Sequence, residues 1–235
     1  MFVFGVGGGI FADQILWPYF IERPLFYQYR LDKSPIYMTE KKEVTIQENT
    51  AISDAVDKAG KAVIGVKVKT KNGVILEGSG LILTSDGLVV TTADLLPKGA
   101  EFYFFIDGEW PAFQVLKTDV KRNLALVKVE KANLTTAGFA DFEKTRLGQS
   151  IFLLGRDFVS ADQEKFFGSP SLIIDEGIVR SLNQNLIQTN LSGKGNMQGS
   201  PVFTVAGEVL GLISVNQAGQ VSVIPVPQIR AFTGL

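Results

Sequence analysis

The residues best suited to covalent chemistry lie in and beside a glycine-rich turn, GKGNMQGSPVF, which spans residues 193–203. Ser192 and Ser200 carry hydroxyl groups, and Lys194 carries an amine that could accept a proton. A serine hydroxyl attacks a carbonyl carbon only when a base removes its proton and donors stabilise the resulting oxyanion. A Ser–Lys pair needs a lysine that burial keeps neutral, whereas a lysine in a glycine-rich turn is expected to be exposed. The turn therefore offers nucleophiles without an evident base.

The usual base is missing from the whole chain. Histidine acts most often as the general base near neutral pH, and the 235 residues contain none. Cysteine is also absent, which excludes disulfides, thiolate catalysis and cysteine-based zinc sites. The acidic residues are scattered through loops without a calcium-loop spacing, and the Gly7–Gly9 cluster does not follow a strand as a dinucleotide-binding loop would. We therefore expect no metal and no cofactor.

Composition favours a folded protein made of strands. Hydrophobic residues make up 46% of the chain, and 24 glycines and 9 prolines separate short runs rich in Val, Ile and Phe. The net charge is −1, from 23 basic and 24 acidic residues, with no long basic run. Nucleic-acid affinity depends on clustered basic side chains, so we expect no nucleic-acid partner.

The strands that must position the turn are predicted from residue 62 onward. A first strand is expected over 62–70, and turn signals at 71–73 and 85–87 (KNG and SDG) separate later apolar runs. No internal repeat indicates a propeller or solenoid. The runs divide into two successive β units, at about 62–130 and about 148–226. This organisation predicts an all-β fold.

The N-terminal segment MFVFGVGGGIFADQILWPYFI, residues 1–21, is about as long as a helix that crosses a bilayer core. Its one charge is Asp13, so we predict a transmembrane or signal-anchor helix, with a linker over 22–49. A buried hairpin or core helix stays open as the alternative. Basic residues follow the apolar run rather than precede it, which by the positive-inside rule alone would leave the globular part in the cytoplasm. A short helix capped by Asn49 or Thr50 is expected next.

Three stretches, in order, resemble the chymotrypsin-like serine proteases, most closely those of HtrA type. They are GSGLILTSDGLVVTTADLL (78–96), DVKRNLALVKVE (119–130) and IQTNLSGKGNMQGSPVFTVAGEVLGLISVN (187–216). The resemblance covers about residues 50–233. It implies two antiparallel six-stranded β-barrels (trypsin-like, PA clan) over 50–235, with an N-terminal hydrophobic helix and short terminal helices. It also implies a membrane-anchored domain that faces away from the cytoplasm.

At the three positions where the HtrA-type proteases carry their catalytic residues, this sequence has other residues. Asp94 stands in place of the histidine, Asn123 in place of the aspartate and Gln198 in place of the nucleophilic serine. Two interpretations stay open: the three side chains form hydrogen bonds across the cleft between the barrels, or they are unconstrained in a solvent-filled groove. Ser200 stands where the family has glycine, and a left-handed backbone tolerates serine less well than glycine.

The resemblance and the substitutions together predict a membrane-anchored pseudoprotease that is not an enzyme and that binds peptides or proteins between the barrels. The family pairs its substrate with strands of the second barrel, which points to edges near 188–190 and 212–216. The alternatives are an active serine endopeptidase with displaced catalytic residues, and a structural subunit of a membrane complex. The expected binding residues are Gln188, Thr189, Asn190, Asn196, Gln198, Ile213, Ser214 and Val215.

Overall fold

The computed structural model describes residues 50–158, 167–192, 195–216 and 218–235, and five residues near the N-terminus: Gly8, Gly9, Phe11, Ala12 and Gln14. Contacts divide the chain into two units, Met1–Ile46 and Gln47–Leu235. The anchor helix predicted over 1–21 falls outside the described residues apart from those five, and the predicted linker over 22–49 falls entirely outside them. None of the helices within the described ranges combines the length and the apolar character needed to span a bilayer.

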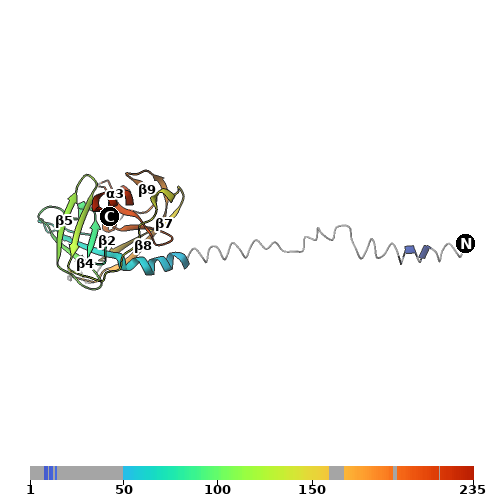
Figure 1. Cartoon of the computed structure of the whole chain (residues 1–235), viewed down its shortest axis with the longest axis horizontal. Coiled ribbons are helices and arrows are strands. Elements are labelled where there is room, and N and C mark those ends of the chain that lie inside the picture. The colour runs from blue at the N-terminus through green and yellow to red at the C-terminus, as the bar shows by residue number, and fades with distance from the viewer. Residues whose placement is uncertain are drawn as a thin grey trace. The chain divides into compact units, whose positions relative to one another are not determined.

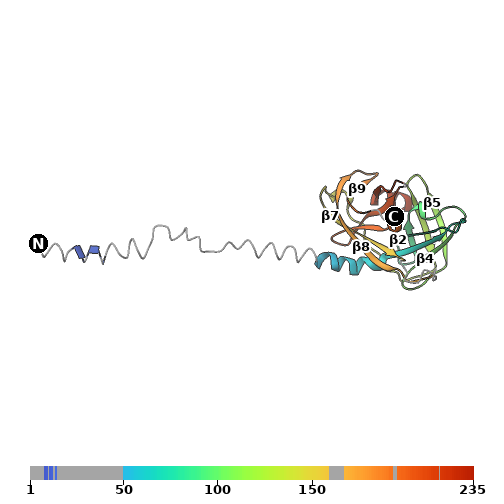
Figure 2. The same cartoon turned by 180° about the vertical axis from the view of Figure 1, so that it is seen from behind.

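The second unit contains two six-stranded antiparallel sheets, which Figures 1 and 2 show side by side. The first sheet has the order β4-β1-β2-β3-β6-β5, and the second closes into a barrel with the order β10-β11-β12-β9-β8-β7. The predicted all-β fold of two six-stranded units is therefore confirmed, with the first sheet barrel-like and β4 and β5 at its ends. The strands of the first sheet are β1 (Val63–Lys69), β2 (Ile75–Ile82), β3 (Leu88–Thr91), β4 (Glu101–Phe105), β5 (Phe113–Asp119) and β6 (Leu124–Val129). Those of the second are β7 (Ser150–Asp157), β8 (Ser171–Leu182), β9 (Ile187–Thr189), β10 (Pro201–Thr204), β11 (Val209–Val215) and β12 (Val221–Pro225).

Short helices join and close the sheets. A helix over 50–59 precedes β1, as the sequence predicts. Among the described residues, one 3-10 helix precedes β1, three lie between later strands and one α-helix follows β12: η3 (Gly60–Ala62), η4 (Ala93–Leu95), η5 (Phe142–Lys144), η6 (Gly195–Met197) and α3 (Val226–Thr233). η4 carries Asp94, and Gln198 follows η6.

One hydrophobic core extends from the first sheet into the second. Leu81 and Leu124 of the first sheet belong to the same buried cluster as Phe152 and Phe203 of the second. The rings of Phe152 and Phe203 stack with their centroids 5.4 Å apart, and both side chains are fully buried. Because removal of buried apolar area from water stabilises the folded state, this shared core fixes one sheet against the other.

Hydrogen bonds from buried Ser79 of β2 add a polar link between the two sheets. Its backbone N–H donates to the Gln198 carbonyl (2.9 Å), and its hydroxyl oxygen accepts from the backbone N–H of Arg156 (2.8 Å). The Thr91 hydroxyl in turn donates to the Ser79 carbonyl (2.6 Å). Buried polar groups must find partners to avoid a large desolvation penalty, so these bonds set the position of Gln198 relative to the first sheet.

Candidate functional site

Three short segments bring Asp94, Asn123 and Gln198 to the seam between the sheets. Asp94 lies in η4 directly after β3, and Gln198 follows η6. Asn123 precedes β6 with a left-handed backbone (φ 53°), a conformation that asparagine adopts more readily than most residues. Its N–H donates to the Val120 carbonyl (3.3 Å), and its carbonyl accepts from Ala93 (3.2 Å), which joins the Asn123 turn to η4.

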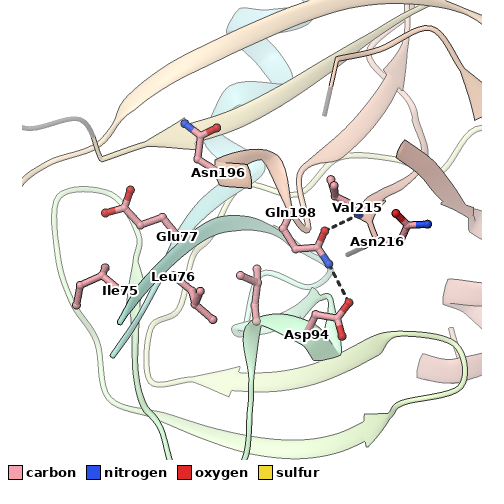
Figure 3. Close-up of a pocket in the computed structure, with 9 residues that line it drawn as sticks. Ile75, Leu76, Glu77, Asp94, Asn196, Gln198, Val215 and Asn216 are labelled. Carbon is pink, nitrogen blue, oxygen red and sulfur yellow. Dashed lines mark hydrogen bonds between the residues drawn. The ribbon is translucent and has the colours of Figure 1, made fainter. Parts of the chain in front are cut away.

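The three side chains converge and are linked by hydrogen bonds. The Asn123 Nδ2 group donates to Asp94 Oδ2 (2.7 Å) and to Ser214 Oγ (3.0 Å), and Asn123 Oδ1 accepts from the Asp94 backbone N–H (2.9 Å). Gln198 Nε2 donates to the same Asp94 Oδ2 (3.3 Å), while Gln198 Oε1 accepts from the Val215 backbone N–H (2.6 Å). Figure 3 shows the two bonds of Gln198 as dashed lines. Of the two interpretations, the geometry favours the connected network.

The carboxamide of Gln198 continues a strand ladder. On the side of β11 that faces β10, the Ile213 N–H donates to the Ser200 carbonyl (2.8 Å), and the Gly199 N–H donates to the Ile213 carbonyl (3.0 Å). Two residues further along β11, Val215 donates to the side-chain oxygen of Gln198. The Gln198 side chain, which is only 6% exposed, therefore takes the place that a backbone carbonyl would hold in the next step of the ladder.

An ion pair supports the turn that carries Asn123. The Arg122 backbone N–H and, to a lesser extent, its guanidinium donate to Asp119 and lower the pKa of that carboxyl below its usual range. Arg122 Nε also donates to Gln228 Oε1 (3.2 Å). The guanidinium is thus occupied by partners other than Asp94.

A cleft of about 920 Å³ opens in front of the network. Figure 3 shows it bordered by the start of β2, by η4, by the region of η6 and by the end of β11. Nine of the residues that the structure describes line it: Ile75, Leu76, Glu77, Asp94, Leu95, Asn196, Gln198, Val215 and Asn216. Its volume lies within the range of about 300–1,000 Å³ that is typical of ligand pockets.

The cleft includes only part of the binding set predicted from sequence. Asn196, Gln198 and Val215 line it, whereas Gln188 and Thr189 line a second, smaller hollow. Asn216 lines both cavities. Three further predicted residues lie elsewhere. Asn190 Oδ1 accepts a hydrogen bond from the Ile178 N–H, and Ser214 Oγ accepts one from the Asn123 side-chain amide. Ile213 is fully buried.

The strand edges expected near 188–190 and 212–216 are largely occupied. β9 lies between β8 and β12, and β11 lies between β10 and β12, within a closed barrel. Beyond Ile213 the ladder toward β10 ends, and there the Gln198 side chain takes the Val215 N–H. β9 and β11 therefore each have a neighbouring strand on both sides.

The displaced nucleophiles considered from sequence are poorly placed for catalysis. Ser200 is fully buried, and its Oγ has no hydrogen-bond partner within the described residues. The Ser192 hydroxyl donates to Asp175 Oδ2 (2.8 Å), and its backbone N–H donates to the same oxygen (2.7 Å). Lys194 lies outside the described residues. The left-handed position of the turn is Gly199 (φ 75°) rather than Ser200, so the doubt raised by a serine after the glycine does not arise.

Five lining residues were missed from sequence. Ile75, Leu76 and Glu77 begin β2 after the KNG turn, and Leu95 and Asn216 follow two of the predicted positions by one residue each. The resembled motif begins only at residue 78, so nothing in it pointed to the start of β2. The turn predicted at 71–73 does indicate these residues, because a strand that begins after this turn must include residues 75–77 before it reaches the stretch that starts at residue 78.

Comparison with known proteins agrees with this architecture. Residues 78–212 match a family model described as "Trypsin-like peptidase domain". Two curated relatives are named "Probable periplasmic serine endoprotease DegP-like". The one from Halomonas elongata is 28% identical over 116 residues, which cover 46% of this chain and 22% of the relative. The one from Pseudomonas putida is 29% identical over 109 residues, which cover 43% of this chain and 21% of the relative.

The chain thus spans about a fifth of the length of these curated relatives. Among solved structures, "HtrA-type protease AlgW with tripeptide" superposes with a TM-score of 0.63 at 20% identity, covering 74% of this chain and 60% of the other. At that identity the likeness concerns the fold, which is the one described above.

Proposed function

Since the chain belongs to the family of trypsin-like peptidase domains, we propose that its cleft binds a peptide that it does not hydrolyse. The observation that carries this proposal is the chemistry of the converging side chains, which are one carboxylate and two carboxamides. We propose that Asp94, Asn123 and Gln198 occupy the places of the base, the orienting acid and the nucleophile.

None of the three can replace the group whose place it takes. A carboxamide nitrogen is a very poor nucleophile, so Gln198 cannot form an acyl-enzyme. An aspartate carboxylate is ordinarily a weak base at neutral pH. Asn123 uses its side-chain amide group to donate hydrogen bonds to Asp94 and Ser214. An orienting acid has the opposite task, because its carboxylate must accept a hydrogen bond from the N–H of the base. Hydrolysis therefore loses all three roles together.

Peptide binding needs none of those roles. A peptide can place its side chains in a groove beside strand backbone. The cleft lies beside the end of β11, where the β10 ladder stops and the Gln198 side chain bonds Val215. The relative solved with a tripeptide has the same fold. The volume of the cleft and its mixed polar and apolar lining support the same use here.

The two alternatives are less well supported. An active peptidase with displaced residues would need a reachable serine beside a base, and Ser200 is buried while Ser192 pairs with a carboxylate. A purely structural subunit would need no open cleft at this seam. For localisation, we propose an extracytoplasmic domain, because the curated relatives are named periplasmic. The membrane anchor over 1–21 stays a prediction.

Photocrosslinking tests peptide binding directly. Ile75 lines the cleft and is 40% exposed, so p-benzoylphenylalanine at this position can face a bound peptide. We expect the labelled full chain to crosslink peptides from a randomised acetylated library. The matched control carries the same group at Val120, which is 82% exposed and is not among the described residues that line the cleft. Equal crosslinking at both positions, or none at position 75, would contradict the proposal.

A further inference from the structure

The charged groups that line the cleft are all acidic. Glu77 comes from β2 and Asp94 from η4, and no lysine or arginine is among the described residues that line the cavity. Figure 3 shows Asp94 beside Gln198, and Glu77 apart from both with Ile75 and Leu76. A cleft lined by one sign of charge concentrates ligands of the other sign.

The two carboxylates differ in how far their charge is already neutralised. Glu77 pairs with Lys67, whose Nζ lies 3.3 Å from Glu77 Oε1 and whose side chain is 9% exposed. Asp94 is exposed and accepts hydrogen bonds from neutral amides, and across the described ranges it makes no ion pair. Arg122, the neighbour of Asn123, is bound to Asp119 and Gln228. Asp94 therefore keeps a negative charge that a ligand can neutralise.

One residue that lines the cleft has a buried acceptor without a protein partner in the described part of the chain. Asn196 Nδ2 donates to Asp157 Oδ1 (3.0 Å), but the buried Asn196 Oδ1 has no hydrogen-bond partner within the described residues. A buried acceptor without a partner carries a desolvation penalty that an incoming N–H donor removes.

The apolar part of the lining fits the stem of a long basic side chain. Ile75, Leu76, Leu95 and Val215 supply hydrocarbon surface in the same cavity. Lysine and arginine bury their methylene groups against such surface while their charged ends reach a polar partner. We propose that the peptide bound by this cleft carries a lysine or arginine, whose stem packs on these residues and whose cation pairs with Asp94. This inference rests on the proposed peptide binding.

Matched peptides test the charge preference. From the library peptides that bind the full chain, acetylated sets are made that differ at one position only: lysine, arginine, norleucine or glutamate. Acetylation removes the terminal amine as a competing cation. We expect the lysine and arginine forms to bind about two- to fivefold more tightly than norleucine in fluorescence anisotropy, the size of an exposed ion pair. The glutamate form is expected to bind weakest.

Two variants assign the effect to its residue. Asp94→Asn keeps the shape and a side-chain acceptor but removes the charge, so it is expected to reduce the lysine peptide to the norleucine affinity. Glu130→Gln removes one charge from an exposed position outside the cleft and is expected to change nothing. The advantage of lysine should also shrink when salt rises from 0.05 to 0.5 M, as screening requires (the Debye length falls from about 14 to about 4 Å).

The outcomes separate the inference from the function on which it rests. If norleucine and lysine peptides bind equally, or if Asp94→Asn leaves the preference intact, the assignment of a cation to Asp94 is overturned while peptide binding stands. If no library peptide binds and position 75 gives no crosslink, the proposed function itself fails.

Discussion

Replacing Gly199 by alanine is expected to lower the free energy of unfolding by about 3 kcal/mol. Gly199 has φ 75°, a left-handed conformation that disfavours any Cβ. A methyl group there would also overlap the carbonyl oxygen of Ser79 and lie 2.6 Å from Thr91 Oγ1. Both neighbours belong to the hydrogen-bonded link between the sheets, so the turn or the seam must shift. The loss is read from the denaturant midpoint at constant m-value.

Gly73 provides the matched control for this substitution. It has φ 78°, but no atom lies within 4 Å of the place that a Cβ would occupy. Gly73→Ala therefore adds only the backbone penalty, about 1 kcal/mol. The difference between the two variants measures how tightly the glycine fits at the seam. Equal losses would show that the close approach of Gly199 to Ser79 does not constrain the fold.

Replacing Asn123 by aspartate is expected to destabilise the protein by about 2 kcal/mol at pH 7. The amide group that donates to Asp94 Oδ2 at 2.7 Å would become a second carboxylate at the same place. Two carboxylates at that separation repel, and one hydrogen bond is lost as well. Since Asp94 is exposed, solvent screening keeps the repulsion far below its value in a dry interior.

The loss should disappear on acidification. The paired carboxyls of the variant hold a shared proton more tightly in the folded state than in the unfolded chain, so the stability relative to wild type is retained at low pH and lost as pH rises. We expect the two unfolding free energies to agree within about 0.5 kcal/mol near pH 4 and to diverge toward pH 7. Asn133→Asp is the control, because Asn133 has a similar left-handed backbone (φ 59°) on an exposed loop. A pH-independent loss in Asn123→Asp, or the same pH dependence in both variants, would contradict the proposed network.

Much of the fold could be predicted because it depends on local patterns. Short apolar runs and glycine turns determine strands wherever they occur, and three stretches resembling one family fixed their arrangement. The convergence of Asp94, Asn123 and Gln198 followed from that arrangement. The order of the strands brings these three positions together, whichever side chains they carry.

The lining of the cleft could not be predicted in the same way. Ile213 is buried and Ile75 is exposed because of how distant segments pack against each other. The alternation of residues within one strand does not predict that packing. The use of the Gln198 carboxamide as a ladder partner for Val215 was equally hidden, because it depends on where β10 stops pairing with β11.

Active-site labelling shows whether the cleft binds peptides without hydrolysing them. The full chain is incubated with a peptidyl phosphonate, and labelling is measured by intact-mass spectrometry. In a separate reaction it is incubated with casein, and the peptides released are measured. We predict no phosphonylated species and no cleavage above that of buffer. Stoichiometric labelling of one serine, with casein cleavage that Ser200→Ala abolishes, would contradict the account.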